Sequence, residues 1–185
     1  VRRWAYASPT VLQEFSGHTG PVYSITTSPD GMMFASGSGD HTIRIWNVSD
    51  GTQVKQLTGH SGAVYAIHFN ADGTQLISCG ADSTIRLWDV TAGKEIRQFV
   101  LGDEIPMAPF YDVSFSPDSQ MVAATGADKK IHLWTVASGK LIRSITGHAD
   151  EVYHVQFNAA GTKILTCGHV GNVNVWNVSD GMQAF

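Results

Sequence analysis

Three residues near the start of the chain have the types found in a hydrolytic triad. His18, Ser36 and Asp40 supply an imidazole, a hydroxyl and a carboxylate, which acyl-transfer enzymes place in series so that the imidazole takes the hydroxyl proton. The imidazole and hydroxyl return at the same spacing as His60 with Ser78 and as His148 with Thr166. An enzyme seldom contains several copies of one active site with residues missing from some copies, so we favour a structural role. In that role each set forms a buried hydrogen-bonded chain that ends on an indole N–H.

The tryptophans show that these sets belong to a repeating unit. They stand at Trp4, Trp46, Trp88, Trp134 and Trp176, separated by 42, 42, 46 and 42 residues. Each closes a short alternating run: VRRW, TIRIW, TIRLW, KIHLW and NVNVW. Alternation with period two predicts a strand with one buried face. A fixed spacing of this length indicates a repeat architecture.

One repeat reads as four strands separated by turns. Residues 59–70, 74–80, 83–90 and 94–99 are strand-like, and ADG, AD and TAG lie between them. Asp40, Asp82 and Asp128 stand at the second hairpin, where a short carboxylate can accept backbone N–H bonds. Four antiparallel strands cannot bury both faces of a sheet alone, so successive sheets must stack. We therefore expect an all-β fold, a β-propeller built of four-stranded antiparallel blades, with four repeats and a partial blade.

The spacing sets the expected boundaries of these blades. Residues 1–15 form the outer strand pair of an incomplete blade, 16–57 blade 1, 58–99 blade 2, 100–145 blade 3 and 146–185 blade 4, truncated in its outer strand. Blade 3 has four extra residues in its connecting loop at 100–110, which includes Asp103 and Glu104. This longer loop is either an insertion that the fold tolerates without a role or an element that contacts a partner.

The repeats resemble WD repeats, in which Gly-His opens a module and Trp-Asp closes it. Gly17-His18, Gly59-His60 and Gly147-His148 match the opening, and Trp88-Asp89 matches the closing pair. The resemblance implies a structural tetrad, carried in full by His18, Ser36, Asp40 and Trp46 and by His60, Ser78, Asp82 and Trp88. Module three has Ala124 in place of the hydroxyl and module four has Val170 in place of the acid. We expect these two blades to be less rigid, because a partly satisfied polar network is worse than an intact one.

A candidate binding surface comes from the first strand of each repeat. All four place a tyrosine at the same point: Tyr23, Tyr65, Tyr111 and Tyr153. The alternation of apolar residues along the strand is interrupted there, which predicts a β-bulge. By resemblance, the tyrosine position and the one two before it, Glu151 in module four, line the mouth of the central channel. Tyrosine is common in binding hot spots, although these rings could instead pack on the neighbouring hairpin.

Other polar residues of these strands are expected to face the channel. They include His68, Asp112 and His154. The three could meet a metal ion, but we favour separate, hydrated channel residues and expect no cofactor.

Composition narrows the class of partner. The net charge of −4 and a pI near 6.0 give no basic patch of the kind that binds nucleic acid. No apolar run approaches the roughly 20 residues of a membrane span, so we expect no membrane association. Cys79 and Cys167 occupy equivalent positions two modules apart, too far to bridge. We expect both to be free and buried, and unpaired cysteines favour a cytoplasmic location.

Four blades and a partial one leave the question of closure. An open arc exposes two apolar sheet faces. The chain could be part of a longer propeller, two copies could close an eight-bladed ring, or four blades could close alone; we favour a fragment, with two-copy closure when it is purified alone. The expected function is a non-catalytic scaffold that binds a protein or peptide at the channel mouth. The alternatives are a regulatory or sensor propeller whose catalytic domain lies elsewhere and, less favoured, an enzyme with its active site in the channel.

Overall fold

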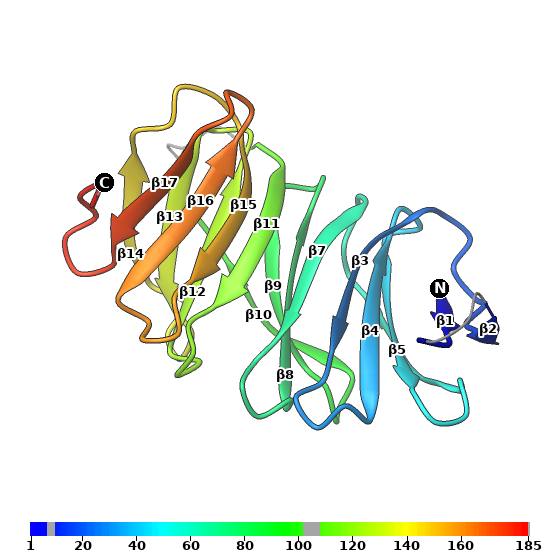
Figure 1. The fold of residues 1–185 in the computed structure, drawn as a ribbon. Coiled ribbons are helices and arrows are strands. Elements are labelled where there is room, and N and C mark those ends of the chain that lie inside the picture. The colour runs from blue at the N-terminus through cyan, green and yellow to red at the C-terminus, as the bar shows by residue number, and fades with distance from the viewer. Residues whose placement is uncertain (7–9, 102–107, 185) are drawn as a thin grey trace.

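The computed structural model describes residues 1–6, 10–101 and 108–184, and the regular structure of these residues is entirely β. Antiparallel sheets stand side by side along an arc, with the N-terminal hairpin at one end and the C-terminal sheet at the other (Figure 1). The prediction of an all-β fold of four-stranded antiparallel sheets is thus confirmed. Within the described ranges, no helix is long and apolar enough to cross a membrane.

The strands follow the sequence repeat. The N-terminal hairpin contains β1 (Arg2–Trp4) and β2 (Val11–Glu14). Sheet one contains β3 (Val22–Thr27), β4 (Met33–Ser38), β5 (Thr42–Asn47) and β6 (Gln53–Thr58). Sheet two contains β7 (Val64–Phe69), β8 (Gln75–Gly80), β9 (Ile85–Asp89) and β10 (Lys94–Phe99). Sheet three contains β11 (Phe110–Phe115), β12 (Met121–Gly126), β13 (Lys130–Thr135) and β14 (Leu141–Thr146). Sheet four contains β15 (Val152–Phe157), β16 (Lys163–Gly168) and β17 (Val173–Asn177).

The hairpin between the second and third strands is shaped by an aspartate. The backbone N–H of Thr42 donates to Asp40 Oδ1 (3.0 Å), and Thr84 N–H donates to Asp82 Oδ1 (3.1 Å). The residue between them takes a positive φ, 68° at His41, which the Asp-turn geometry accommodates. One carboxylate oxygen is therefore used by the turn, and the other is free to face the preceding loop.

Apolar side chains of neighbouring sheets form the core between them. Ile43 and Ile45 of β5 pack with Ile67 and Phe69 of β7, and the same positions pair sheet two with three and sheet three with four. Burying each such side chain is worth about 1.5–3 kcal/mol. The tryptophans that close the four repeats are at most 2% exposed: Trp46, Trp88, Trp134 and Trp176. The last three lie in these interfaces, whereas Trp46 packs with Phe15 beside the N-terminal hairpin.

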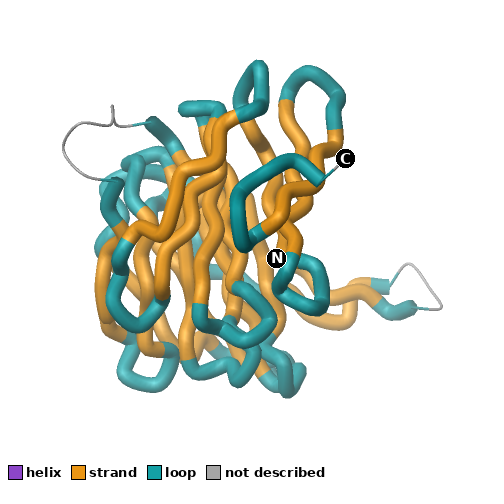
Figure 2. Tube along the Cα trace, turned by 90° about the vertical axis from the view of Figure 1, so that its left-hand side faces the viewer, coloured by secondary structure: helices purple, strands orange, loops and turns teal. Residues whose placement is uncertain are grey.

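Each first strand contains the predicted bulge at its tyrosine. The pairing register of β3 with β4 shifts between Val22 and Ser24, which leaves Tyr23 unpaired. The other three first strands shift at the same point. The turns gather along two rims when the arc is viewed from its C-terminal end (Figure 2). The bulges lie near one rim, at the start of each first strand.

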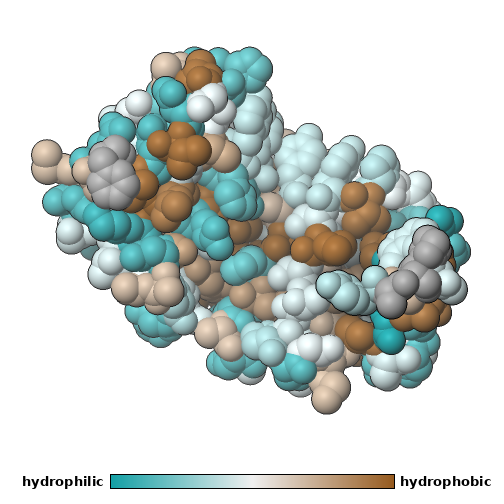
Figure 3. All heavy atoms as spheres, in the orientation of Figure 1, coloured by the Kyte–Doolittle hydropathy of each residue, from teal (hydrophilic) through white to brown (hydrophobic). Residues whose placement is uncertain are grey.

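The two ends of the arc are open. Ile25 of β3 is 61% exposed, whereas the equivalent Ile67 is 4% exposed. At the other end Val173 of β17 is 68% exposed, whereas the equivalent Ile85 is fully buried. Hydrophobic side chains accordingly gather over β16 and β17 and again between β3 and the N-terminal hairpin (Figure 3).

The outer edge of sheet four begins a further strand. Trp176 forms a single bridge with Gln183, and the N–H of Ala184 donates to the carbonyl of Val175 (2.7 Å). At the opposite end, Phe15 packs edge-on against Phe34 with ring centres 4.7 Å apart. The hairpin thus covers sheet one in the way that the outer strands of sheet one cover sheet two.

Candidate functional site

The structure brings together the tetrad residues of sheets one and two. His18 contacts Asp40 through Nδ1 (2.8 Å) and Ser36 through Nε2 (2.8 Å), and the Trp46 indole N–H donates to Ser36 Oγ (2.8 Å). Sheet two repeats the arrangement with His60, Asp82, Ser78 and Trp88 at 2.7–2.9 Å. In each of these two modules, the bonds join the opening loop, the second strand, the hairpin and the third strand.

The first of these chains has a consistent direction of hydrogen bonding. Burial alone raises the pKa of the Asp40 carboxyl, but bonds from Thr42, His18 and Thr19 outweigh it and hold that pKa well below its usual range. When the imidazole is neutral with its proton on Nδ1, the ionised carboxylate accepts from His18 Nδ1–H and Nε2 accepts the Ser36 hydroxyl proton. The Ser36 oxygen then accepts the indole N–H of Trp46.

The same geometry speaks against hydrolysis by these residues. Ser36 and Ser78 are both completely buried, and each oxygen already accepts an indole hydrogen. A nucleophile must reach the substrate carbonyl. These serines have the polar contacts of a triad without access to a substrate.

Sheet four has a shorter form of the chain. His148 Nε2 contacts Thr166 Oγ1 (2.7 Å), which accepts the Trp176 indole N–H (2.8 Å). Val170 stands where the acid would be and is 48% exposed. Burial lowers the pKa of His148, which favours its neutral form. The expectation that this sheet is less rigid stays a prediction.

Sheet three replaces the chain with different partners. Trp134 donates its indole N–H to the carbonyl oxygen of Val100 (3.1 Å). His132 contacts Asp128 through Nε2 (2.7 Å) and Ser144 through Nδ1 (2.8 Å). The premise of an unsatisfied network is therefore wrong for these groups, because new residues supply the bonds. Residues 102–107 of the longer loop, with Asp103 and Glu104, lie outside the described residues.

Sequence reasoning missed His132 and Ser144. The signal was present, since His132 stands where the other complete modules have Arg44 and Arg86. A histidine in a strand position otherwise taken by arginine, in the module that has lost its own Gly-His, indicates a substitute partner for Asp128.

The four predicted tyrosines form a continuous row along the rim. Ring centres of Tyr23 and Tyr65 are 5.5 Å apart, those of Tyr65 and Tyr111 6.1 Å, and those of Tyr111 and Tyr153 5.4 Å. Tyr23 is 54% and Tyr153 44% exposed, and the two between them are half-buried. Both Tyr111 and Tyr153 donate their hydroxyl hydrogens to Glu151 Oε2 (3.2 Å each). The row crosses the first strands of all four repeats.

Two of the predicted channel residues meet below this row. His154 Nδ1 lies 2.6 Å from Asp112 Oδ2, and the same oxygen accepts the backbone N–H of Val155 (2.8 Å). The hydrogen bond to Asp112 raises the pKa of His154. In the part of the chain that the structure describes, no three metal-ligating side chains converge. Asp112 thus links sheet three to sheet four through hydrogen bonds.

The remaining sequence candidates differ in burial. His68, which was predicted to face the channel, is exposed. Cys79 and Cys167 are both free, but Cys79 alone is buried and Cys167 is half-buried. The expectation of a buried thiol was therefore wrong for Cys167, because its sheet has an open outer face.

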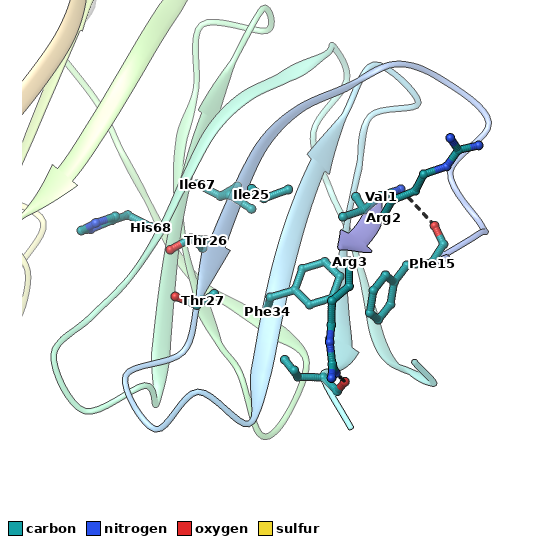
Figure 4. Close-up of a pocket in the computed structure, with 11 residues that line it drawn as sticks. Val1, Arg2, Arg3, Phe15, Ile25, Thr26, Thr27, Phe34, Ile67 and His68 are labelled. Atoms are coloured by element: carbon teal, nitrogen blue, oxygen red, sulfur yellow. Dashed lines mark hydrogen bonds between the residues drawn. The ribbon is translucent and has the colours of Figure 1, made fainter. Parts of the chain in front are cut away.

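A groove of about 580 Å³ lies at the N-terminal end of the arc. Ile25 and Phe34 of sheet one, Ile67 of sheet two, and Val1 and Phe15 of the hairpin line it, as Figure 4 shows. Between complete sheets, the corresponding space is filled by the first two strands of a module. The groove therefore occupies the place that the first two strands hold in the other sheets.

The comparisons with known proteins agree with this arrangement. A family model described as WD domain, G-beta repeat matches residues 9–47, 51–89, 107–135 and 139–177. The "Serine-threonine kinase receptor-associated protein" of Homo sapiens and that of Mus musculus are each 42% identical over 43 residues, and that of Gallus gallus is 40% identical over 43. These stretches are 23% of this chain, and the match covers only 12% of the relatives' own length. Because the repeat model matches most of the residues, the chain belongs to the WD domain, G-beta repeat family.

Proposed function

We propose that this chain is a non-catalytic scaffold that binds a protein or peptide partner along the tyrosine row. WD repeats imply a protein-interaction scaffold. Binding along this row is supported by the continuous ring contacts across four sheets, made by Tyr23, Tyr65, Tyr111 and Tyr153.

The bulges set the direction in which these four rings point. A tyrosine paired normally in a strand would point into the sheet interface or the channel wall, but the bulge re-aims it toward the rim. Tyrosine offers a large apolar area with a polar tip and loses little conformational entropy on binding. Rings already held by their neighbours have less freedom still to lose, which favours affinity.

The relatives support an interaction role. The relatives are called serine-threonine kinase receptor-associated protein, a name that refers to association with a receptor. For the present chain we carry over only the general role of association, since the match spans a single repeat length.

Peptide selection tests the proposal. Peptides selected by display against the chain are measured by fluorescence polarisation on Tyr65→Ala and Tyr153→Ala, with Ile96→Ala on the outer strand β10 as the control. Ile96 is 43% exposed and lies away from the first strands. We expect each tyrosine variant to weaken binding by about ten-fold with a nearly unchanged melting temperature. A large fall in melting temperature would show that the rings serve to pack the sheets together. An equal loss of peptide binding in the control would show that the row is not the binding site.

We further propose that each range from 16–57 to 146–185 is one blade and that further blades cover both ends of the arc. The exposure of Ile25 and Val173 supports this, since both positions are buried wherever a neighbouring sheet is present. For the purified chain those blades come from a second copy, and in a longer propeller they come from the remainder of the polypeptide.

A further inference from the structure

Glu151 has an unusual position at the C-terminal end of the tyrosine row. Its Oε2 accepts hydrogen bonds from two phenols, those of Tyr111 and Tyr153, at 3.2 Å each. Among the residues that the structure describes, Oε1 has no hydrogen-bond partner, and no cationic nitrogen lies within 4.0 Å of either oxygen. The carboxylate is therefore held in place by neutral donors, with one oxygen left to a ligand.

The charges around Glu151 leave this oxygen uncompensated. Its neighbour Asp150 is a second acid, and Nζ of Lys129 lies 3.7 Å from Asp150 Oδ1. Lys129 Nζ also donates to the carbonyl of Ala149 (3.2 Å). Lys129 therefore pairs with Asp150, and His169, whose Nδ1 lies 3.4 Å from the Tyr153 hydroxyl, is the other basic side chain near this end of the row. Neither forms an ion pair with Glu151, so its carboxylate keeps its negative charge unpaired among the residues that the structure describes.

The aromatic rings add a second attraction for a cation. Tyr153 is 44% exposed, and its hydroxyl donates to the carboxylate, which polarises the phenol and enriches the ring face in negative charge. A guanidinium or ammonium over such a face gains about 0.5–2 kcal/mol. One cation can contact the ring face and Glu151 Oε1 together, because the phenol and the carboxylate are already in hydrogen-bond contact.

We infer that this end of the row is a binding subsite for a basic side chain of the partner peptide, with its cation on Glu151 and its stem against Tyr153. The inference rests on the proposed function, since it specifies the partner that the tyrosine row takes. Tyr23 and Tyr65, which lie far from the carboxylate along the row, then receive the apolar residues of the same peptide.

Small probes separate the subsite from the rest of the row. N-acetyl-arginine methylamide and N-acetyl-lysine methylamide are titrated into the ¹⁵N-labelled chain, with N-acetyl-citrulline methylamide as the neutral isostere of arginine. Resonances of residues 151–154 should shift saturably with both basic probes. We expect the citrulline probe to bind roughly ten-fold more weakly, which corresponds to about 1.4 kcal/mol.

Matched variants identify the carboxylate. Glu151→Gln keeps a carbonyl oxygen for both phenols and removes the charge, and it should weaken the basic probes by about ten-fold. Asp150→Asn removes the same charge one residue away and should weaken them less than about two-fold.

Equal binding of the citrulline probe, or equal loss in the two variants, would overturn the inference. Neither outcome touches the proposed function, which depends on the response of selected peptides to Tyr65→Ala. Conversely, loss of peptide binding to that variant with no response to the basic probes would leave the row as a docking surface without a cation subsite.

Discussion

The indole N–H of Trp134 donates to the carbonyl oxygen of Val100 (3.1 Å), which joins the longest connecting loop to the tryptophan whose usual hydroxyl partner has been lost. Ala124 occupies the hydroxyl position and is completely buried. A buried indole N–H without an acceptor costs about 1–3 kcal/mol. The backbone carbonyl at the start of the loop removes that cost. The Val100 carbonyl therefore takes the place of the missing hydroxyl as the acceptor for this indole.

His132 should be the most sensitive polar residue of sheet three. It is completely buried and contacts both Asp128 and Ser144. His132→Ala leaves a cavity and two unpaired groups, so we expect a loss of about 2–4 kcal/mol in the free energy of unfolding. Urea denaturation measures it, with Lys140→Ala, at an exposed position just before β14, as the control. A change below about 0.5 kcal/mol, the range of ordinary surface substitutions, would show that the substitute network contributes nothing.

Two substitutions in the tetrad of sheet two should lower stability by different amounts. Trp88 is 1% exposed, and Trp88→Ala should destabilise the chain by roughly 3–5 kcal/mol through the cavity alone. Ser78→Ala removes the shared oxygen and leaves the indole N–H and His60 Nε2 unpaired, at a cost of about 1–3 kcal/mol. Thermal unfolding of both variants checks the order. A loss below about 1 kcal/mol for Trp88→Ala would contradict the buried position on which the tetrad depends.

Asp82 should make stability fall in acid. Burial raises the pKa of this carboxyl, but bonds from His60, Ser61 and Thr84 lower it below the ordinary value of 3.8. A depressed pKa contributes stability that is present above pH 3.8 and is lost as the pH falls toward the folded-state pKa. Asp82→Asn should therefore be less stable than the natural chain at pH 7, by about 1–3 kcal/mol. Denaturation at pH 7 and pH 3 tests this, since the difference should shrink in acid, and a difference independent of pH would be inconsistent with the ionised partner.

The stability that the pair of His154 and Asp112 contributes should change with pH in the opposite direction. The hydrogen bond to Asp112 raises the pKa of His154 above 6.5, against a smaller effect of burial. Its contribution to stability is therefore present below pH 6.5 and is lost as the pH rises through the folded-state pKa. An NMR titration of His154 measures that pKa directly. Asp112→Asn keeps an acceptor for Val155 N–H and should return the pKa of His154 toward its ordinary value. His68, the other titrating group near Asp112, should change less, and an unmoved His154 would refute the pairing.

Much of this molecule could be predicted from the period of its tryptophans. Period-two runs closing on Trp46, Trp88, Trp134 and Trp176 predict strands, and their equal spacing predicts stacked sheets, because each apolar face needs a neighbour. The bulges were predictable too, since the apolar pattern breaks step at each tyrosine. The contacts of module three were not predictable in this way. His132 and Val100 belong to no motif, and a backbone carbonyl leaves no signature in a sequence.

The candidate site was predictable only as a set of positions. Alignment of the repeats places four tyrosines at one level, and stacking must bring them near one another. Whether neighbouring rings touch depends on the distance between the inner strands, and the link from Tyr111 to Glu151 crosses two modules. The half-buried state of Cys167 and the exposure of Ile25 have another cause. Both follow from the missing neighbour of an end sheet, which no single repeat reveals.

The open ends lead to a prediction about mass in solution. Ile25 and Val173 are 61% and 68% exposed, and water-facing apolar surface of this kind favours association. If a second copy covers these faces, light scattering across a concentration series should give a mass near twice 19.9 kDa. Val173→Lys should return the chain to a monomer without unfolding it, because the side chain touches solvent in the single copy. Ile142→Lys, at a position 44% exposed on the outer strand β14, should leave the larger mass unchanged. A monomer of 19.9 kDa at every concentration would rule out closure by a second copy and would favour blades supplied by a longer polypeptide.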